Sequence, residues 1–383
     1  MPLIYRSTSM TDMASKLPTE HRALTLEDNG TGIRLSVVKT PQISPGAAVI
    51  RMLAVTVLPY HRDVYSETPT LPYPTPLVPG FSGIGRVAAL PVDAASLSIG
   101  DLVYVDCVVR ARDDPTAFFL SATFEGLSEG SKKLMRDAWR DGMFAEYAKM
   151  PLENCIPLNE KRLLHELGYT VPEVMYISQL LVPYGGLRAI QLEAGETIVV
   201  CPATGNYGGA CVQVALAMGA RVVAMGRNEI ELERMQNLVQ MPPSNMSLET
   251  VKISGLVEAE TEALKTFGPI DAILDISPRA AKDSTHMAAA LAALRNGGRC
   301  CLMGHVGPAI AQPQVMTNNL TLKGKMMYER ADIIQFVKLL QSGRFARGKQ
   351  FVDVKTFILA DWKEAFDVSA GHNGMGKAVV IVP

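Results

Sequence analysis

The chain has 383 residues, a length that accommodates two or three domains of ordinary size. Apolar residues make up 48% and charged residues 20%, and the mean hydropathy is +0.14, which indicates sizeable buried cores and excludes a disordered chain. The 37 basic and 38 acidic side chains nearly cancel, so the charge gives no reason to expect nucleic acid or a membrane as a partner.

Membrane spans and export signals are not apparent in the sequence. No run of 18 apolar residues occurs, and residues 1–18 contain no continuous apolar segment. The six cysteines lie in or beside apolar segments without C-x-x-C spacing, which is typical of reduced, buried thiols. We therefore expect a cytoplasmic protein.

After a polar extension over residues 1–20, the first part of the chain has the pattern of β structure. Short runs rich in Val, Ile and Leu are separated by Gly and Pro; they cover residues 33–40, 47–58, 81–90, 100–109 and 143–150. Such runs predict a small barrel-like β domain. The charged residues 126–141 predict a helical insertion, either a solvated surface helix or a lid over a cleft.

From about residue 165, apolar runs alternate with helical stretches, which predicts a parallel sheet covered on both faces. After residue 345 the pattern returns to β structure, so the chain is expected to re-enter the first domain. This predicts a β domain made of residues 1–164 and 345–383, interrupted by an α/β domain over residues 165–344.

The most informative segment is the turn between the strand-like residues 197–203 and the helical residues after it. Its sequence is Thr204-Gly205-Asn206-Tyr207-Gly208. Glycine at such a turn lets the backbone approach a pyrophosphate, and the amides that begin the next helix face the anion. A strand before, a helix after and a second strand about 20 residues on favour dinucleotide binding over a structural glycine turn.

The residues that end this second strand indicate which dinucleotide binds. NAD sites usually place an acid there for the ribose hydroxyl, whereas this chain has Gly226-Arg227-Asn228. The planar fork of arginine suits the 2′-phosphate of NADP. A solvated arginine is the alternative, and Glu229 nearby would be unfavourable if it faced the phosphate. We predict NADP(H) as the cofactor.

The order of β domain, nucleotide fold and β return resembles the medium-chain dehydrogenase/reductase superfamily over residues 20–383. Further markers are Pro79-Gly80-Phe81-Ser82-Gly83, Gly100-Asp101 and Gly297-Gly298. The resemblance implies an α/β fold with a Rossmann-type doubly wound parallel sheet plus a GroES-like β-barrel catalytic domain. It is greatest to the zinc-independent branch of quinone oxidoreductases and enoyl reductases. Residues 57–65 also resemble fungal alcohol dehydrogenase-like members, for which secondary metabolism is an expected setting.

The zinc ligands of the alcohol dehydrogenases in this superfamily have no counterparts here. Tyr60 stands where the first ligand is expected, and Phe81 replaces the histidine of the Gly-His-Glu motif. Of the four cysteines of their structural zinc lobe, only Cys107 is present. Zinc needs thiolate, imidazole or carboxylate ligands in tetrahedral reach, so we expect no metal.

The resemblance also implies where the reaction takes place. Without a metal, an activated C=C bond or a quinone is a suitable hydride acceptor, because its developing charge needs only hydrogen-bond donors and a proton. Tyr60 is the first choice for the catalytic proton donor, although a structural role suits it equally. His61 and Tyr65 are second choices for catalytic residues. Ser277, Gly304, His305 and Lys377 are implicated in cofactor binding by family analogy.

The leading hypothesis is an NADPH-dependent, zinc-independent reductase of a small enone, enoyl or quinone substrate. The alternatives are a metal-free carbonyl or alcohol oxidoreductase and a nucleotide-binding member that has lost its redox chemistry. By analogy with relatives that pair edge strands, a homodimer is expected, with residues 299–327 supplying the edge.

Overall fold

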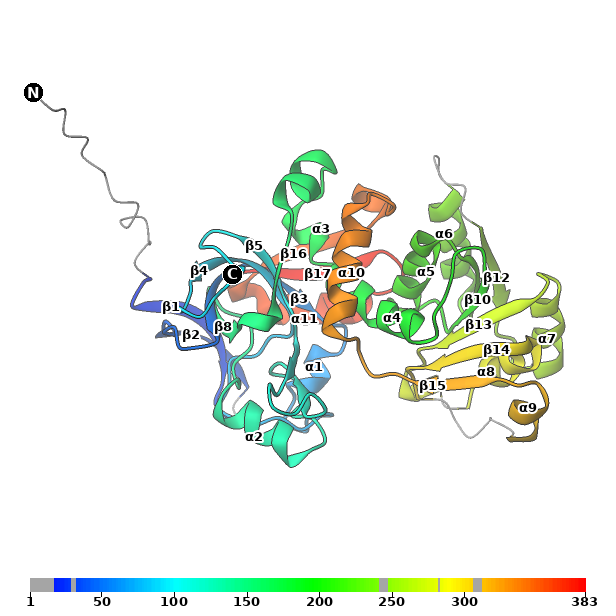
Figure 1. Ribbon diagram of the computed structural model, residues 1–383, viewed down its shortest axis with the longest axis horizontal. Helices are drawn as coiled ribbons and strands as arrows, with labels where there is room; N and C mark the ends of the chain where they lie inside the picture. Colours follow the sequence, from blue (N-terminus) through cyan, green and yellow to red (C-terminus); the bar gives the residue numbers. More distant parts are fainter. Residues whose placement is uncertain (1–16, 29–31, 241–246, 282, 306–311) are drawn as a thin grey trace, which may run out of the picture.

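The computed structural model describes residues 17–28, 32–240, 247–281, 283–305 and 312–383. Two bodies lie next to each other in Figure 1, a β-rich body on the left and a helix-covered sheet on the right. This arrangement confirms the predicted combination of a doubly wound parallel sheet with a GroES-like β domain.

The β-rich body is built on a seven-stranded sheet in the order β16-β17-β3-β4-β5-β9, with β8 also paired to β3. Its strands are β3 (Ala47–Val57), β4 (Gly83–Ala89), β5 (Leu102–Val105), β8 (Tyr147–Pro151), β9 (Cys155–Pro157), β16 (Asp353–Ile358) and β17 (Lys377–Val382). Two hairpins flank the sheet, β1 (Glu20–Leu26) with β2 (Ile33–Lys39), and β6 (Val108–Arg110) with β7 (Phe118–Leu120). The pairing of β17 with β3 places the C-terminal residues in this sheet.

The second body contains a six-stranded sheet in the order β12-β11-β10-β13-β14-β15, and every pair of neighbours is parallel. Its strands are β10 (Thr197–Cys201), β11 (Arg221–Gly226), β12 (Leu248–Lys252), β13 (Ile270–Asp275), β14 (Leu294–Leu302) and β15 (Thr321–Gly324). The central strand β10 is buried along its whole length, as its apolar residues from Ile198 to Cys201 predict. The order reverses between β10 and β13, and ligands of such sheets bind beyond the carboxyl ends of the strands at this point.

Helices cover the six-stranded sheet and join the two bodies. Those of the sheet domain are α4 (Ile177–Ala189), α5 (Asn206–Met218), α6 (Glu229–Gln240), α7 (Val257–Lys265), α8 (His286–Ala293), α9 (Gln312–Thr317) and α10 (Arg330–Gln341). The remaining helices are α1 (His61–Val64), α2 (Glu129–Asp137), α3 (Val171–Val174) and α11 (Trp362–Gly371). One hydrophobic core contains Leu102 and Tyr104 of β5 together with residues of α4 and α5. The two bodies therefore share buried apolar surface.

The predicted helical insertion is α2. It begins at Ser128, whose hydroxyl oxygen accepts a hydrogen bond from the Ser131 amide at 3.1 Å. The helix buries Met135 and contacts β7. In Figure 1, α2 lies below the barrel and not between the two bodies.

Two other expectations concern the chain as a whole. The six cysteines are free and buried, as their apolar surroundings predict. Among the described residues, none of the helices has the length and apolar character needed to cross a membrane.

Candidate functional site

The glycine turn connects β10 to α5 at the carboxyl edge of the parallel sheet. Gly205 is the N-cap residue of α5. Because it has no side chain, it forms no side-chain capping hydrogen bond to the first amides of the helix. A Cβ built on Gly205 would meet no atom within 4 Å, whereas one on Gly208 would lie 2.1 Å from the Pro202 carbonyl oxygen. Gly205 therefore leaves open space at a helix N-terminus, and Gly208 permits close contact between helix and strand. Both features suit a bound pyrophosphate.

The end of β11 lies beside this turn. Gly226 is buried, and a Cβ there would lie 2.4 Å from Cγ2 of Thr204. The side-chain oxygen of Asn228 accepts a hydrogen bond from the Glu231 amide at 3.2 Å, so Asn228 begins α6. Arg227 is exposed and makes no hydrogen bond or ion pair with the residues that the structure describes. Its guanidinium is therefore available to an anion.

The carboxylates nearest Arg227 in the sequence have other partners. Glu229 pairs with Lys252 at 3.0 Å, and Glu231 forms a two-point contact with Arg234 at 2.6 and 2.8 Å. The Lys377 ammonium lies 3.9 Å from the same Glu231. Lys377, which is predicted to bind the cofactor, is thus near the end of β11. The Glu231 carboxylate there contacts both Arg234 and Lys377.

The predicted residues that follow β13 and β14 also meet at this edge of the sheet. The His305 amide donates to the Ser277 carbonyl oxygen at 2.9 Å. A Cβ on Gly304 would lie 2.0 Å from the Ser277 nitrogen, so only glycine fits this contact. His305 itself is exposed. The structure therefore brings Ser277, Gly304 and His305 together at the point where the strand order reverses.

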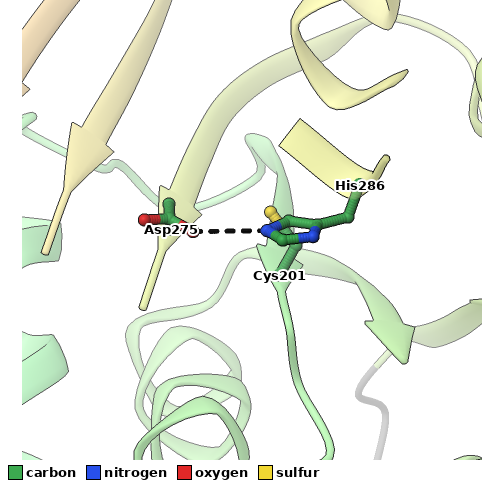
Figure 2. A group of neighbouring side chains, drawn as sticks. All are labelled: Cys201, Asp275 and His286. Carbon is green, nitrogen blue, oxygen red and sulfur yellow. Dashed lines mark hydrogen bonds and ion pairs between the residues drawn. The ribbon is translucent and has the colours of Figure 1, made fainter. Parts of the chain in front are cut away.

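A buried polar cluster lies directly behind these residues. Figure 2 shows Cys201, Asp275 and His286, which come from the ends of β10 and β13 and the start of α8. Their possible ligand atoms lie within 4.8 Å of one another, as a metal would require. However, both ring nitrogens of His286 already form 2.8 Å hydrogen bonds, to the hydroxyls of Ser277 and Ser284.

The chemistry of the same cluster also fits a metal ion poorly. Burial, together with the nearby Asp275 carboxylate, raises the pKa of the Cys201 thiol well above its usual range. Zinc binds the thiolate, which this environment disfavours. Ser277 also donates a short hydrogen bond to Asp275. We therefore describe the cluster as a hydrogen-bonded network that holds the connection between β13 and α8.

The predicted residue Tyr60 lies across the domain boundary from the glycine turn. Its phenol oxygen is 3.3 Å from that of Tyr207, the second residue of α5. Both residues are half-buried, and burial raises the pKa of both phenols, so each carries its proton at neutral pH. The structure therefore places a phenol pair of the two domains next to the expected cofactor turn.

His61 and Tyr65 lie in the barrel interior. The His61 ring packs 5.5 Å from the rings of Tyr65, Phe144 and Phe366, measured between centroids. Burial lowers the pKa of His61 to about 3, so the ring is neutral at physiological pH. The Tyr65 hydroxyl donates to the Ala122 carbonyl oxygen at 3.0 Å and accepts from the Gly80 amide at 3.1 Å. Neither polar group is brought to the Tyr60–Tyr207 pair.

A second polar cluster at the domain interface was not anticipated. The Tyr328 hydroxyl donates to Oδ1 of Asp106 at 2.7 Å and lies 3.5 Å from the Tyr104 hydroxyl. Burial raises the pKa of Asp106 to about 6, which the Tyr328 hydrogen bond opposes. Cys107, also buried, lies 3.6 Å from the Tyr328 hydroxyl. The Asp106 carboxylate within the apolar residues 102–109 could have indicated this cluster from the sequence. No feature of the sequence indicated that Tyr328, 222 residues away, contacts it.

These features define a two-domain dinucleotide-binding protein, and comparisons with known proteins agree. The family model for the alcohol dehydrogenase GroES-like domain matches residues 44–160, and the model named zinc-binding dehydrogenase matches residues 208–342. An alcohol dehydrogenase of Geobacillus stearothermophilus is 23% identical over 94% of this chain and 99% of its own length. An acryloyl-coenzyme A reductase of Sulfurisphaera tokodaii has the same identity and coverage.

Among solved structures, an E. coli alcohol dehydrogenase in complex with NADH is 16% identical and superimposes with a TM-score of 0.73. The alignment covers 96% of this chain and all of that one, and at this identity it shows the fold alone. The chain belongs to the medium-chain dehydrogenase/reductase superfamily, as the sequence markers predicted. It is an oxidoreductase of that superfamily, whose members bind nicotinamide cofactors.

Proposed function

We propose that the protein is an NADPH-dependent reductase that transfers hydride to an activated C=C bond or a quinone without a metal ion. The observation that carries the proposal is the 3.3 Å contact between the phenols of Tyr60 and Tyr207. It supplies O–H donors beside the glycine turn, where the superfamily's zinc enzymes are expected to hold their first metal ligand.

The preference for NADPH rests on the charges at the end of β11. Arg227 is exposed and unpaired among the described residues, while Glu229 and Glu231 are engaged by Lys252 and Arg234. A guanidinium without a competing carboxylate suits a 2′-phosphate. NAD is usually selected by an acid that binds the ribose hydroxyl. Glu229 and Glu231, the first two acids that follow β11 in the chain, are both engaged by cations, so NADH lacks that contact.

The proposal of metal-free chemistry rests on residue types. Position 81 is a phenylalanine that is 2% exposed, and phenylalanine has no atom that can bind zinc. Tyr60 is protonated, and its oxygen is engaged by Tyr207. The Cys201–Asp275–His286 group lies within the sheet domain, and both ring nitrogens of its histidine are engaged by serine hydroxyls. These residues offer no open metal position at the phenol pair.

The chain's own groups would stabilise charge and supply the proton. A nicotinamide cofactor, when bound at the glycine turn, would supply the hydride for the β-carbon of an enone, and negative charge would then develop on the carbonyl oxygen. One phenol of the pair donates its hydrogen bond to the other, which leaves the second O–H free to face that oxygen. We assign this second donor to Tyr60, and we assign His61 and Tyr65 to the packing of the barrel that holds it.

A carbonyl or alcohol oxidoreductase is the second candidate, favoured by relatives named alcohol dehydrogenases. The acryloyl-coenzyme A reductases among the relatives favour the first candidate. The same O–H donor could assist either acceptor, because both develop negative charge on oxygen. The acceptor that is reduced therefore has to be measured.

The test measures NADPH and NADH oxidation at 340 nm with acryloyl-coenzyme A, 2-cyclohexenone, 1,4-benzoquinone and a simple aldehyde. We expect turnover of an alkene or quinone with NADPH, unaffected by prior treatment with 1,10-phenanthroline. Tyr60→Phe should lower kcat about 10²-fold or more, the usual effect of losing a positioned proton donor. Tyr184→Phe, a buried tyrosine of α4, is the matched control and should keep wild-type kcat.

Other results would decide against the proposal. Turnover of the aldehyde alone would select the second candidate. Inactivation by the chelator would reject metal-free chemistry. Tight NADP⁺ binding without oxidation of NADPH by any acceptor would indicate a member that has lost redox chemistry.

A further inference from the structure

A cavity lies on the barrel body, far from the glycine turn. Its volume is about 560 Å³, and it lies between the β1–β2 hairpin, the end of α2 and β8. In Figure 1 these elements are at the end of the molecule opposite the parallel sheet. A ligand there would therefore not be the hydride acceptor. The volume is within the range of pockets that hold small organic molecules.

The walls of this cavity combine aromatic and apolar surface. Trp139 is half-buried, and the Lys149 ammonium lies 5.7 Å from the centre of its ring. His21 and Tyr147 meet edge to face at 5.8 Å on another wall. Burial lowers the pKa of His21, which keeps this ring neutral near pH 7. A flat apolar group between these walls would bury surface on both sides.

The charge of the lining is predominantly positive. Four cations, Lys39, Arg136, Arg140 and Lys149, face two carboxylates, Asp137 and Asp141. One of these carboxylates is partly used by the fold, because Oδ1 of Asp141 accepts the Val78 amide at 3.0 Å. The cavity therefore has an excess of cationic groups to offer a ligand.

Arg140 supplies the sharpest indication of what is bound. Its side chain is 38% exposed, and its guanidinium makes no hydrogen bond with the described residues. The nearest carboxylate, Asp141, is 3.9 Å away, too far for a hydrogen bond. The accessible guanidinium N–H groups therefore have no acceptor in the described residues, and an anionic oxygen is their strongest partner.

From these contacts we propose that the cavity is a binding site for a small aromatic anion, a carboxylate or sulfonate on a planar ring system. The ring lies against Trp139, and the anionic group lies at Arg140 with Lys149 nearby. This site is separate from the proposed reductase activity and does not depend on it.

The test is a titration of the full chain with 8-anilinonaphthalene-1-sulfonate, followed by energy transfer from tryptophan. The chain has two tryptophans, Trp139 and Trp362, so Trp139→Phe should abolish most of the transfer and Trp362→Phe should preserve it. Arg140→Gln should weaken binding about tenfold, the size expected for losing one charge-assisted hydrogen bond. Lys133→Gln, an exposed position of α2 outside the cavity, is the charge-matched control and should bind as the wild type does.

An uncharged probe with the same ring system, N-phenyl-1-naphthylamine, measures the role of the anion. We expect its affinity to be at least tenfold weaker and insensitive to Arg140→Gln. Equal affinity of the sulfonate for the Arg140→Gln and Lys133→Gln variants would overturn the proposal. So would energy transfer that persists in Trp139→Phe, since the probe would then be bound elsewhere. Circular dichroism that matches the wild type shows that each variant is folded.

Discussion

Replacing Asp106 by asparagine tests the electrostatics of the polar cluster at the domain interface. Asp106 is 3% exposed, and its carboxylate accepts the Tyr328 hydroxyl at 2.7 Å. Burial raises its pKa from 3.8 to about 6. Asparagine keeps an acceptor oxygen for the same hydroxyl but carries no charge at any pH.

The size and sign of the effect follow from this shift. Between pH 3.8 and about pH 6, the folded protein holds a proton on Asp106 that the unfolded chain has released. Rising pH therefore lowers the free energy of unfolding across this window. Above about pH 6, the stability contributed by the bound proton is completely lost. Two pKa units correspond to about 3 kcal/mol. The difference in unfolding free energy between Asp106→Asn and wild type should therefore increase, in favour of the variant, by about 3 kcal/mol from pH 4 to pH 7.

The assay is urea unfolding at several pH values from 4 to 7.5, followed by fluorescence and circular dichroism. Coincident transitions and equal m-values allow the free energies of unfolding to be compared. Asp113→Asn, in an exposed loop of the barrel, is the control for removing a surface carboxylate. Tyr328→Phe should steepen the pH dependence, because the hydrogen bond that stabilises the ionised form is lost. A constant difference between wild type and Asp106→Asn across this range would refute the reasoning.

Three further predictions concern the parallel sheet. Arg227→Ala should raise the KM for NADPH about tenfold or more and leave that for NADH unchanged, in steady-state kinetics with both cofactors. Gly205→Ala should keep the melting temperature, because its Cβ enters open space, and should weaken NADPH binding in calorimetry, because that space is where the pyrophosphate is expected. Gly208→Ala should lower the melting temperature, because its Cβ would lie 2.1 Å from the Pro202 oxygen. We also propose that the edge strand β15 pairs with its copy in a homodimer, so light scattering should give a dimer for wild type and a monomer for Leu322→Pro.

The fold could be predicted from local patterns because its strands differ so clearly in type. The strand β10, apolar from Ile198 to Cys201, is buried on both faces, and short runs between Gly and Pro form the barrel. The chain's return to the first sheet was also predictable, since residues 377–383 form an apolar strand after a helix. Side chains at the domain interface were less accessible to prediction. Tyr328 contacts Asp106 only because α10 docks on the barrel, and no local pattern encodes that approach.

The residues of the candidate site also include some whose placement could be predicted from the sequence and others whose placement could not. The geometry of the glycine turn and the exposure of Arg227 were predictable, because both depend on one strand–turn–helix unit. The roles of His61 and Tyr65 were not, because sequence alone gave no sign that α1 turns both rings into the barrel among Phe144 and Phe366. Proximity in the sequence to Tyr60 was a poor guide, since adjacent residues on one helical turn face different directions.

The position of Tyr207 constrains how the proposed reaction could work. It belongs to the turn that would hold the pyrophosphate, so the same backbone fixes both this phenol and the cofactor. Tyr60 comes from the barrel, so the two oxygens meet at the contact between the two bodies. The proposed proton donor Tyr60 therefore depends on a residue of the other body, and under the proposed function Tyr207→Phe should impair kcat more than it impairs NADPH binding.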